Sequence, residues 1–246
     1  MRIALMADLH ANRLALEACL AHARQGSPDR FVFLGDFVGY GAEPAEVLEL
    51  VMTEVDRGAI AIAGNHDHAV AHDQEAMTPD AETALAWTRG QLGLDAREFL
   101  ASLPMRFEDD TRLYVHASPQ TYPPWLYIQD GPAAKRALEA SRAQTVFCGH
   151  THRPALHGIT ATGQLVSFEP VPGVPIPLPR HRRWLTVVGS VGQPRDGNTA
   201  AAYALFDTTR GEITHLRVPY DVNAAAQAVL RAGLPPVLAQ RLREGR

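Results

Sequence analysis

The sequence has only two cysteines and no long run of apolar residues, and each shortage excludes a class of protein. Cys19 and Cys148 are too few for a disulfide framework and are typical of a reducing compartment. No apolar stretch reaches the length of a membrane-spanning helix. The opening MRIALMADLH lacks the charge pattern and apolar length of a secretory signal. We therefore expect a cytoplasmic protein without a membrane partner.

The chain also lacks a strong net charge, which is formally -4 at pH 7. Nucleic-acid-binding proteins usually carry a basic stripe with interleaved aromatic residues. The one dense basic cluster, Arg180 to Arg183, lies in the proline-rich segment 169–183. Proline cannot donate to a strand ladder, so we expect an exposed, extended connection there. These features disfavour nucleic acid as a partner.

Apolar periodicity predicts a mixed α/β fold. Strand-like runs at 3–7, 31–34 and 59–63 alternate with amphipathic helical patterns, which indicates β-α-β units with parallel pairing. A helical region at 81–103 is divided around Gly93. Further strands are expected at 113–115, 145–148, 165–168, 184–188, 201–206 and 213–218. The length of 246 residues fits a single catalytic domain spanning residues 1–246.

Polar residues follow the ends of several of these apolar runs, in the strings LMADLHAN, FLGDFVGYGA, GNHD, YVHAS and CGHTHRP. The carboxyl ends of parallel strands share one edge of a sheet, so we expect these side chains to meet. Each alone reads as a helix cap, a turn residue or a partly buried polar group. Together they indicate a site for two divalent ions, as used in phosphate-ester hydrolysis. The candidate ligands are Asp8, His10, Asp36, Asn65, His116, His150 and His152.

The strings resemble those of the calcineurin-like metallophosphoesterases: D-x-H, G-D, G-N-H-D, a lone His and G-H-x-H, in that order. The strings GDFVGYGAEPAE and GSVGQPRDGN look like the small bacterial and archaeal phosphodiesterase branch. The resemblance covers nearly the whole chain except its C-terminal region. It implies a two-sheet β-sandwich flanked by helices in four layers, whereas the local pattern supports only mixed α/β.

The resemblance also implies a role for each ligand. Asp8, His10 and His152 would bind the first metal, Asn65, His116 and His150 the second, and Asp36 would bridge the two. A hydroxide bridging the metals would then attack phosphorus directly. Mixed nitrogen and oxygen ligation favours manganese, is compatible with iron, zinc, nickel or cobalt, and disfavours magnesium.

Further residues have expected roles around the ions. His66 resembles the family histidine that faces the substrate, and Asp67 is expected to orient it. Asn12 and Arg195 are candidates for substrate binding, Arg195 through its planar guanidinium. His68 and His72 are expected to be solvated helix or loop residues, and Cys148 a core thiol.

The leading hypothesis is a phosphodiesterase for small or nucleotide-derived phosphate esters. Alternatives are a phosphomonoesterase, a serine/threonine protein phosphatase-like enzyme, a nuclease, or a non-catalytic scaffold like the retromer subunit that resembles this fold. Protein phosphatases have G-D-x-V-D-R-G where this chain has GDFVGYG, so their phosphate-binding arginine is missing. The presence of His66 and of every expected ligand disfavours a scaffold. The oligomeric state stays open.

Overall fold

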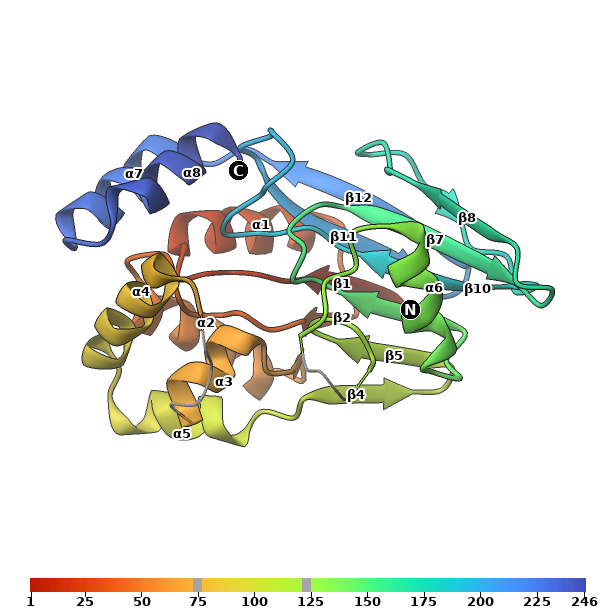
Figure 1. Ribbon diagram of the computed structural model, residues 1–246, viewed down its shortest axis with the longest axis horizontal. Coiled ribbons are helices and arrows are strands. Elements are labelled where there is room, and N and C mark those ends of the chain that lie inside the picture. The colour runs from red at the N-terminus through yellow and green to blue at the C-terminus, as the bar shows by residue number, and fades with distance from the viewer. Residues whose placement is uncertain (73–76, 121–124) are drawn as a thin grey trace.

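Two sheets packed face to face organise the part of the chain that the computed structural model describes, residues 1–72, 77–120 and 125–246 (Figure 1). Each sheet has six strands, and helices cover their outer faces. This helix–sheet–sheet–helix layering confirms the expected four-layer fold. Within the described ranges, no helix is both long and apolar enough to cross a membrane.

The first sheet combines three strands from the start of the chain with three from its second half. In spatial order they are β3 (Ile60–Ala61), β2 (Arg30–Phe33), β1 (Arg2–Met6), β11 (Ala201–Asp207), β12 (Glu212–Val218) and β9 (Ile176–Pro177). β1 is parallel to β2, and β2 to β3. The helices α1 (Arg13–Gln25) and α2 (Pro44–Asp56) connect them, so the expected β-α-β units are confirmed.

The proline-rich segment lies at an edge of this sheet. Its two-residue strand β9 pairs only with β12, where Ile176 is opposite Ile213 and Pro177 opposite Glu212. An edge tolerates proline because one side of the strand needs no donor. Residues 169–181 are therefore outside a sheet interior, as expected, although the strand β9 was not anticipated. Arg182 and Arg183 differ from the expectation, because they belong to the central strand β10 (Arg182–Val187) of the second sheet.

The second sheet has three adjacent parallel strands at its centre. In spatial order its strands are β4 (Arg106–Asp109), β5 (Arg112–Val115), β6 (Thr145–Cys148), β10 (Arg182–Val187), β7 (Ala155–Thr160) and β8 (Leu165–Phe168). β5, β6 and β10 run parallel, and the other pairings are antiparallel. The helix α6 (Gly131–Glu139) covers the outer face of this sheet. β4, β7 and α6 were not expected from the sequence.

Strand β1 shows why the central strands read as continuous apolar runs. Ile3 and Leu5 face the second sheet, whereas Ala4 and Met6 pack in the cluster that contains α1 and α2. Successive side chains of a strand point to opposite faces, so a strand covered on both faces has no polar positions. The alternation of apolar and polar residues is therefore absent from the central strands.

The remaining helices surround one end of the sheets. α3 (Asn65–His72), α4 (Pro79–Gln91) and α5 (Leu94–Ser102) follow β3, and Gly93 separates α4 from α5 as expected. At the C-terminus, α7 (Val222–Arg231) and α8 (Pro236–Glu244) form a hairpin that shares an apolar cluster with Ala84 of α4 (Figure 1).

A buried histidine connects the two sheets. His215 of β12 is 2 % exposed, and its Nε2 contacts the backbone oxygen of Val187 in β10 at 3.3 Å. Burial lowers the pKa of His215 from the ordinary value of 6.5 to about 4. Below pH 6.5 the unfolded chain therefore takes up a proton at this position that the folded protein excludes until about pH 4.

We predict that His215→Gln reduces the acid sensitivity of the fold. Above pH 6.5, His215 does not change the unfolding free energy with pH. Between pH 6.5 and about 4, its exclusion of a proton lowers the unfolding free energy by about 1.4 kcal/mol per pH unit. Between pH 7.5 and 5.0, the variant should lose about 2 kcal/mol less unfolding free energy than the parent, as measured by urea denaturation. The exposed His181→Gln is the control. An identical pH dependence in parent and His215→Gln would contradict the prediction.

Candidate metal centre

The carboxyl ends of the parallel strands of both sheets meet, and the predicted ligands lie there. Each follows a strand: Asp8 and His10 follow β1, Asp36 follows β2, Asn65 follows β3, His116 follows β5, and His150 and His152 follow β6. All are buried except Asn65, which is half-buried. The expectation that these separated strings converge is therefore confirmed.

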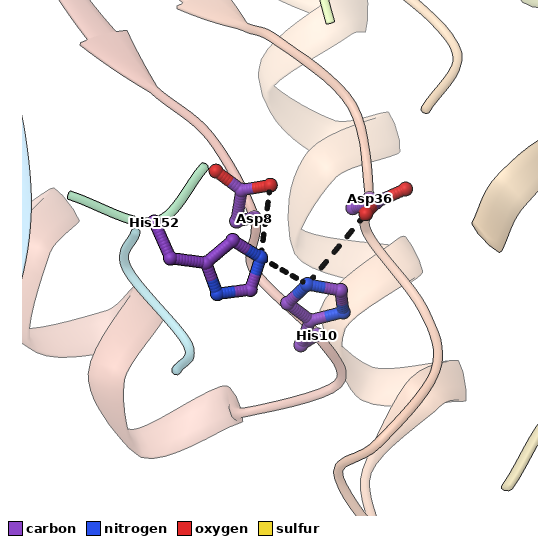
Figure 2. Close-up of side chains that lie close together, drawn as sticks. All are labelled: Asp8, His10, Asp36 and His152. Atoms are coloured by element: carbon purple, nitrogen blue, oxygen red, sulfur yellow. Dashed lines mark hydrogen bonds and ion pairs between the residues drawn. The ribbon is translucent and has the colours of Figure 1, made fainter. Parts of the chain in front are cut away.

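The side chains form two groups that share one carboxylate. In each group, one ligand atom per residue lies within 4.8 Å of all the others. The groups are Asp8, His10, Asp36 and His152, and Asp36, His116 and His150. Figure 2 shows the first group, in which His152 lies between Asp8 and His10, and His10 lies between His152 and Asp36. Asn65 adjoins the second group, because its Oδ1 is 3.1 Å from His116 Nε2.

Backbone carbonyls orient three of the four imidazoles. His10 Nδ1 contacts the oxygen of Val38 at 3.2 Å, His116 Nδ1 that of Leu34 at 2.7 Å, and His152 Nδ1 that of Gln193 at 2.6 Å. A carbonyl oxygen can only accept, so each Nδ1 carries the hydrogen. In a neutral ring the lone pair is then on Nε2, which faces the cluster. Outer hydrogen bonds of this kind orient metal-binding histidines.

The two Nε2 atoms of His10 and His152 are 3.1 Å apart. As neutral rings both present lone pairs, and two acceptors cannot hydrogen-bond to each other. A cation between them satisfies both. His116 Nε2 and His150 Nδ1 are likewise 3.1 Å apart. The donor set therefore fits divalent metal ions.

The pKa values distinguish the imidazoles of the cluster. Burial lowers the pKa of His10 well below its usual value and that of His150 to about 3. Burial would also lower the pKa of His116, but the carboxylate of Asp36 outweighs it and raises the pKa to about 9. Asp36 Oδ2 lies 3.3 Å from His116 Nε2. A proton on His116 thus balances part of the buried negative charge.

Backbone amides and glycines hold the two carboxylates in place. Both oxygens of Asp8 accept from the amide of His150 at 3.0 Å, and Asp36 Oδ1 accepts from the amide of His66 at 2.9 Å. A Cβ on Gly64 would lie 2.2 Å from Asp36 Oδ1, and one on Gly149 would lie 2.6 Å from Asp8 Oδ2. The absence of a side chain at Gly64 and Gly149 therefore leaves room for the two carboxylates.

Left-handed backbone is concentrated in this site. The positive φ angles are 54° at Asp8, 44° at His10, 54° at Asp36, 64° at His150 and 60° at His152. Non-glycine residues rarely adopt this conformation, and it clusters at functional sites. Asp8 and His10 thus reach the site from a tight turn. A simple strand geometry, with both residues on one face, does not apply to them.

His66 lines a cavity beside the cluster of candidate ligands, and it forms no hydrogen bond with Asp67 among the described residues. The cavity has a volume of about 490 Å³ and is lined by Asp36, His66 and Arg195 among others. His66 Nδ1 has no partner among the described residues, and burial lowers the pKa of His66 to about 4.

The carboxylate of Asp67 accepts hydrogen bonds from three backbone amides. The donors are Phe37, Val38 and Gly64. These bonds connect Asp67 to the loop after Asp36, and no hydrogen bond joins Asp67 to His66 among the described residues. The expected role of Asp67 in orienting His66 stays a prediction.

Asn12 is also a structural residue, contrary to its expected role in substrate binding. Its Oδ1 accepts from the amide of Ala15 and caps α1. Its Nδ2 donates to the oxygen of Gly192 at 2.8 Å and to the hydroxyl of Tyr220 at 3.1 Å. With both amide hydrogens used, Asn12 has no donor left for a substrate.

Arg195 reaches the cavity together with the aromatic residues Tyr40 and Tyr127. Its guanidinium carbon is 5.6 Å from the centre of the Tyr40 ring, and Tyr40 in turn lies 4.5 Å from the ring of His66. Tyr127 stacks on His150, with ring centres 4.0 Å apart. The string GDFVGYG includes Tyr40, whereas no motif singles out Tyr127.

The remaining histidine and cysteine expectations agree with the structure. His68 is half-buried and His72 exposed on α3, and neither is among the residues that line the 490 Å³ cavity. Cys148 is a buried free thiol in the core beside α6.

Comparison with known proteins identifies the family. The profile of the calcineurin-like phosphoesterase superfamily domain matches residues 1–211. An uncharacterized protein, MJ0912, from Methanocaldococcus jannaschii is 31% identical over 250 residues, which cover 99% of this chain and 98% of that protein. Two solved structures are also similar along almost their whole length.

The first is a metallophosphoesterase from Sphaerobacter thermophilus, with 36% identity, a TM-score of 0.88, and coverage of 100% of this chain and 99% of that one. The second is the hypothetical protein PH1004 from Pyrococcus horikoshii, with 19% identity, a TM-score of 0.81, and coverage of 100% and 98%. This second likeness concerns the fold alone.

The chain belongs to the calcineurin-like phosphoesterase superfamily, whose members are metal-dependent hydrolases of phosphate esters. The fold, the enzyme class and the Asp/His cluster that can bind divalent metals therefore agree.

Proposed function

We propose that this protein is a phosphodiesterase that hydrolyses small or nucleotide-derived phosphate diesters with two divalent ions. The observation that carries the proposal is the sharing of Asp36 between two buried groups of ligand atoms. A shared carboxylate reduces the repulsion between two adjacent cations. We further propose that residues 1–246 act as one catalytic domain in the cytoplasm.

The ligands divide between the two ions. Asp8, His10 and His152 would bind one, Asn65, His116 and His150 would bind the other, and Asp36 would bind both. Nitrogen and oxygen donors without a thiolate favour manganese, with iron, zinc, nickel and cobalt as further candidates. When bound, such ions lower the pKa of a coordinated water and polarise the phosphoryl oxygens.

His66 acts on the substrate. Its ring lines the cavity beside Asp36. Its Nδ1 is closed to solvent and faces Gly39, where an added Cβ would lie 2.3 Å away, so a substrate would meet Nε2. The low pKa that burial imposes keeps the free imidazole neutral at neutral pH. A neutral ring still has one N–H, which can donate a hydrogen bond to the leaving oxygen as charge develops on it. A bound phosphate anion would raise the pKa and favour proton transfer.

Diester preference follows from the charges around the phosphate. The GDFVGYG string has no arginine. Among the described residues that line the metal cavity, Arg195 is the one arginine. A monoester dianion depends more on charge-assisted hydrogen bonds than a diester monoanion does. One arginine beside Tyr40 therefore suits a diester better than a monoester.

We predict that Asp36→Asn disturbs both metal sites. The loss of the shared carboxylate should reduce bound metal below two equivalents, and hydrolysis should fall by more than the roughly 10- to 100-fold typical of outer-shell changes. Metal analysis and steady-state kinetics measure the two effects. The exposed Asp95→Asn, made as a control, should keep both properties. Two equivalents of metal and normal turnover in Asp36→Asn would disprove the bridging role.

We predict that His66→Ala separates catalysis from metal binding. Loss of the donor to the leaving oxygen should lower kcat by about 10²- to 10⁴-fold while metal content stays at the parent value. His72→Ala, on the same helix but exposed, is the matched control. Loss of metal in His66→Ala would instead identify His66 as a ligand.

The substrate class is tested with matched esters. Manganese-loaded protein should hydrolyse bis(p-nitrophenyl) phosphate at least as efficiently as p-nitrophenyl phosphate. Arg195→Ala should raise KM for the monoester more than for the diester, by the roughly 1.5 to 3 kcal/mol of one charged hydrogen bond. The exposed Arg142→Ala serves as control. A strong monoester preference that survives Arg195→Ala would indicate a phosphomonoesterase instead.

A further inference from the structure

A second cavity adjoins the cavity of the metal centre. It has a volume of about 630 Å³, and both cavities are lined by Tyr127 and Arg195. It lies where the start of α6 meets β7 and β8, elements that are side by side in Figure 1. We name it the side cavity. Its volume is within the range of pockets that hold a small organic ligand.

Two aromatic rings line the side cavity and remain exposed. The exposed fraction is 48% for Tyr127 and 42% for Phe168, which lies at the end of β8. One face of the Tyr127 ring stacks on His150, at an interplanar angle of 24°. Exposed aromatic rings beside a catalytic centre offer stacking surfaces for a planar ligand, and base–aromatic stacking tolerates any base.

A buried histidine forms part of the wall of the side cavity. His157 of β7 lines the side cavity, is only 5 % exposed, and contacts Ser167 Oγ through Nδ1 at 2.8 Å. Its Nε2 is buried without a hydrogen-bond partner among the described residues. This atom is closed to solvent, so His157 shapes the wall of the side cavity and offers no accessible donor or acceptor at Nε2.

The charges of the side cavity are balanced. Arg153 and Arg195 face Asp130 and Glu169 around it. Arg153 also donates through Nε to the backbone oxygen of Arg195, and Asp130 accepts from the amide of Ala133 at the start of α6. Two cations and two carboxylates do not favour a second phosphate. They suit an uncharged group with hydroxyl and amide hydrogens, because carboxylates accept such hydrogen bonds.

We propose that the side cavity holds the nucleoside of a nucleoside phosphodiester while its phosphate lies at the metal centre. The base stacks against the aromatic rings, and the sugar hydroxyls and base amides meet the polar groups. Arg195 lies at the junction of the two cavities, where the phosphate joins the nucleoside. This assignment rests on the proposed phosphodiesterase function and specifies its substrate class.

Two diesters with the same leaving group test the assignment. The p-nitrophenyl ester of thymidine 5′-phosphate carries a nucleoside, and p-nitrophenyl ethyl phosphate does not. The measured quantity is the ratio of their kcat/KM values, in which differences in metal loading cancel. The ratio should be well above one in the parent, and Phe168→Ser should lower it about 5- to 100-fold through lost stacking. Phe168→Tyr and the exposed Leu94→Ser should retain the parent ratio.

Other outcomes separate the two proposals. A parent ratio near one, or a ratio that Phe168→Ser leaves unchanged, overturns the nucleoside site while diester hydrolysis stands. If the parent hydrolyses neither diester, the phosphodiesterase proposal fails. Calorimetric titration with thymidine 5′-phosphate and with inorganic phosphate then decides the side cavity by itself. Tighter binding of the nucleotide that is lost in Phe168→Ser supports the site, and equal binding of both ligands rejects it.

Discussion

The need of buried carboxylates for positive charge governs the centre of this structure. Asp8 and Asp36 are almost completely inaccessible to solvent, at 0 % and 1 % exposed. Isolated charges are costly in such a place unless cations or donors compensate them. Backbone amides supply part of the compensation, and the imidazoles around Asp36 supply another part through the raised pKa of His116. Two divalent ions would supply the rest.

The architecture follows from this requirement. Separate sheets each contribute parallel strands, and their carboxyl ends bring ligands together from widely spaced parts of the chain. The turns after these strands adopt left-handed backbone at five of the expected ligands. Such strain persists only where packing on every side over-determines the conformation. The two covered sheets provide that packing, and Asn12 and Asp67 contribute by fastening the surrounding turns.

The proposed nucleoside site lies in another part of the fold. The candidate metal ligands come from the ends of strands β1, β2, β3, β5 and β6, whereas α6, β7 and β8 build the side cavity. Tyr127 and Arg195 border both. The sequence of the elements around the side cavity can therefore change without a change in the candidate ligands. This is consistent with one family hydrolysing different phosphate esters.

The sequence by itself determined the mixed α/β class, most strands and the candidate ligands, because apolar runs followed by Asp, Asn and His are local features. The two-sheet sandwich was expected only from the resemblance of these motifs to a known family. Tertiary structure decided what depends on distant partners. Asn12 resembled a substrate-binding residue, but Gly192 and Tyr220 occupy its amide, and backbone amides donate to the carboxylate of Asp67. Tyr127 carries no motif, and its place above His150 arises only when the loop before α6 meets the end of β6. The hydrogen-bond partners of a side chain and the shape of a cavity depend on residues that meet only in the folded protein. The spacing of residues along the chain does not reveal them.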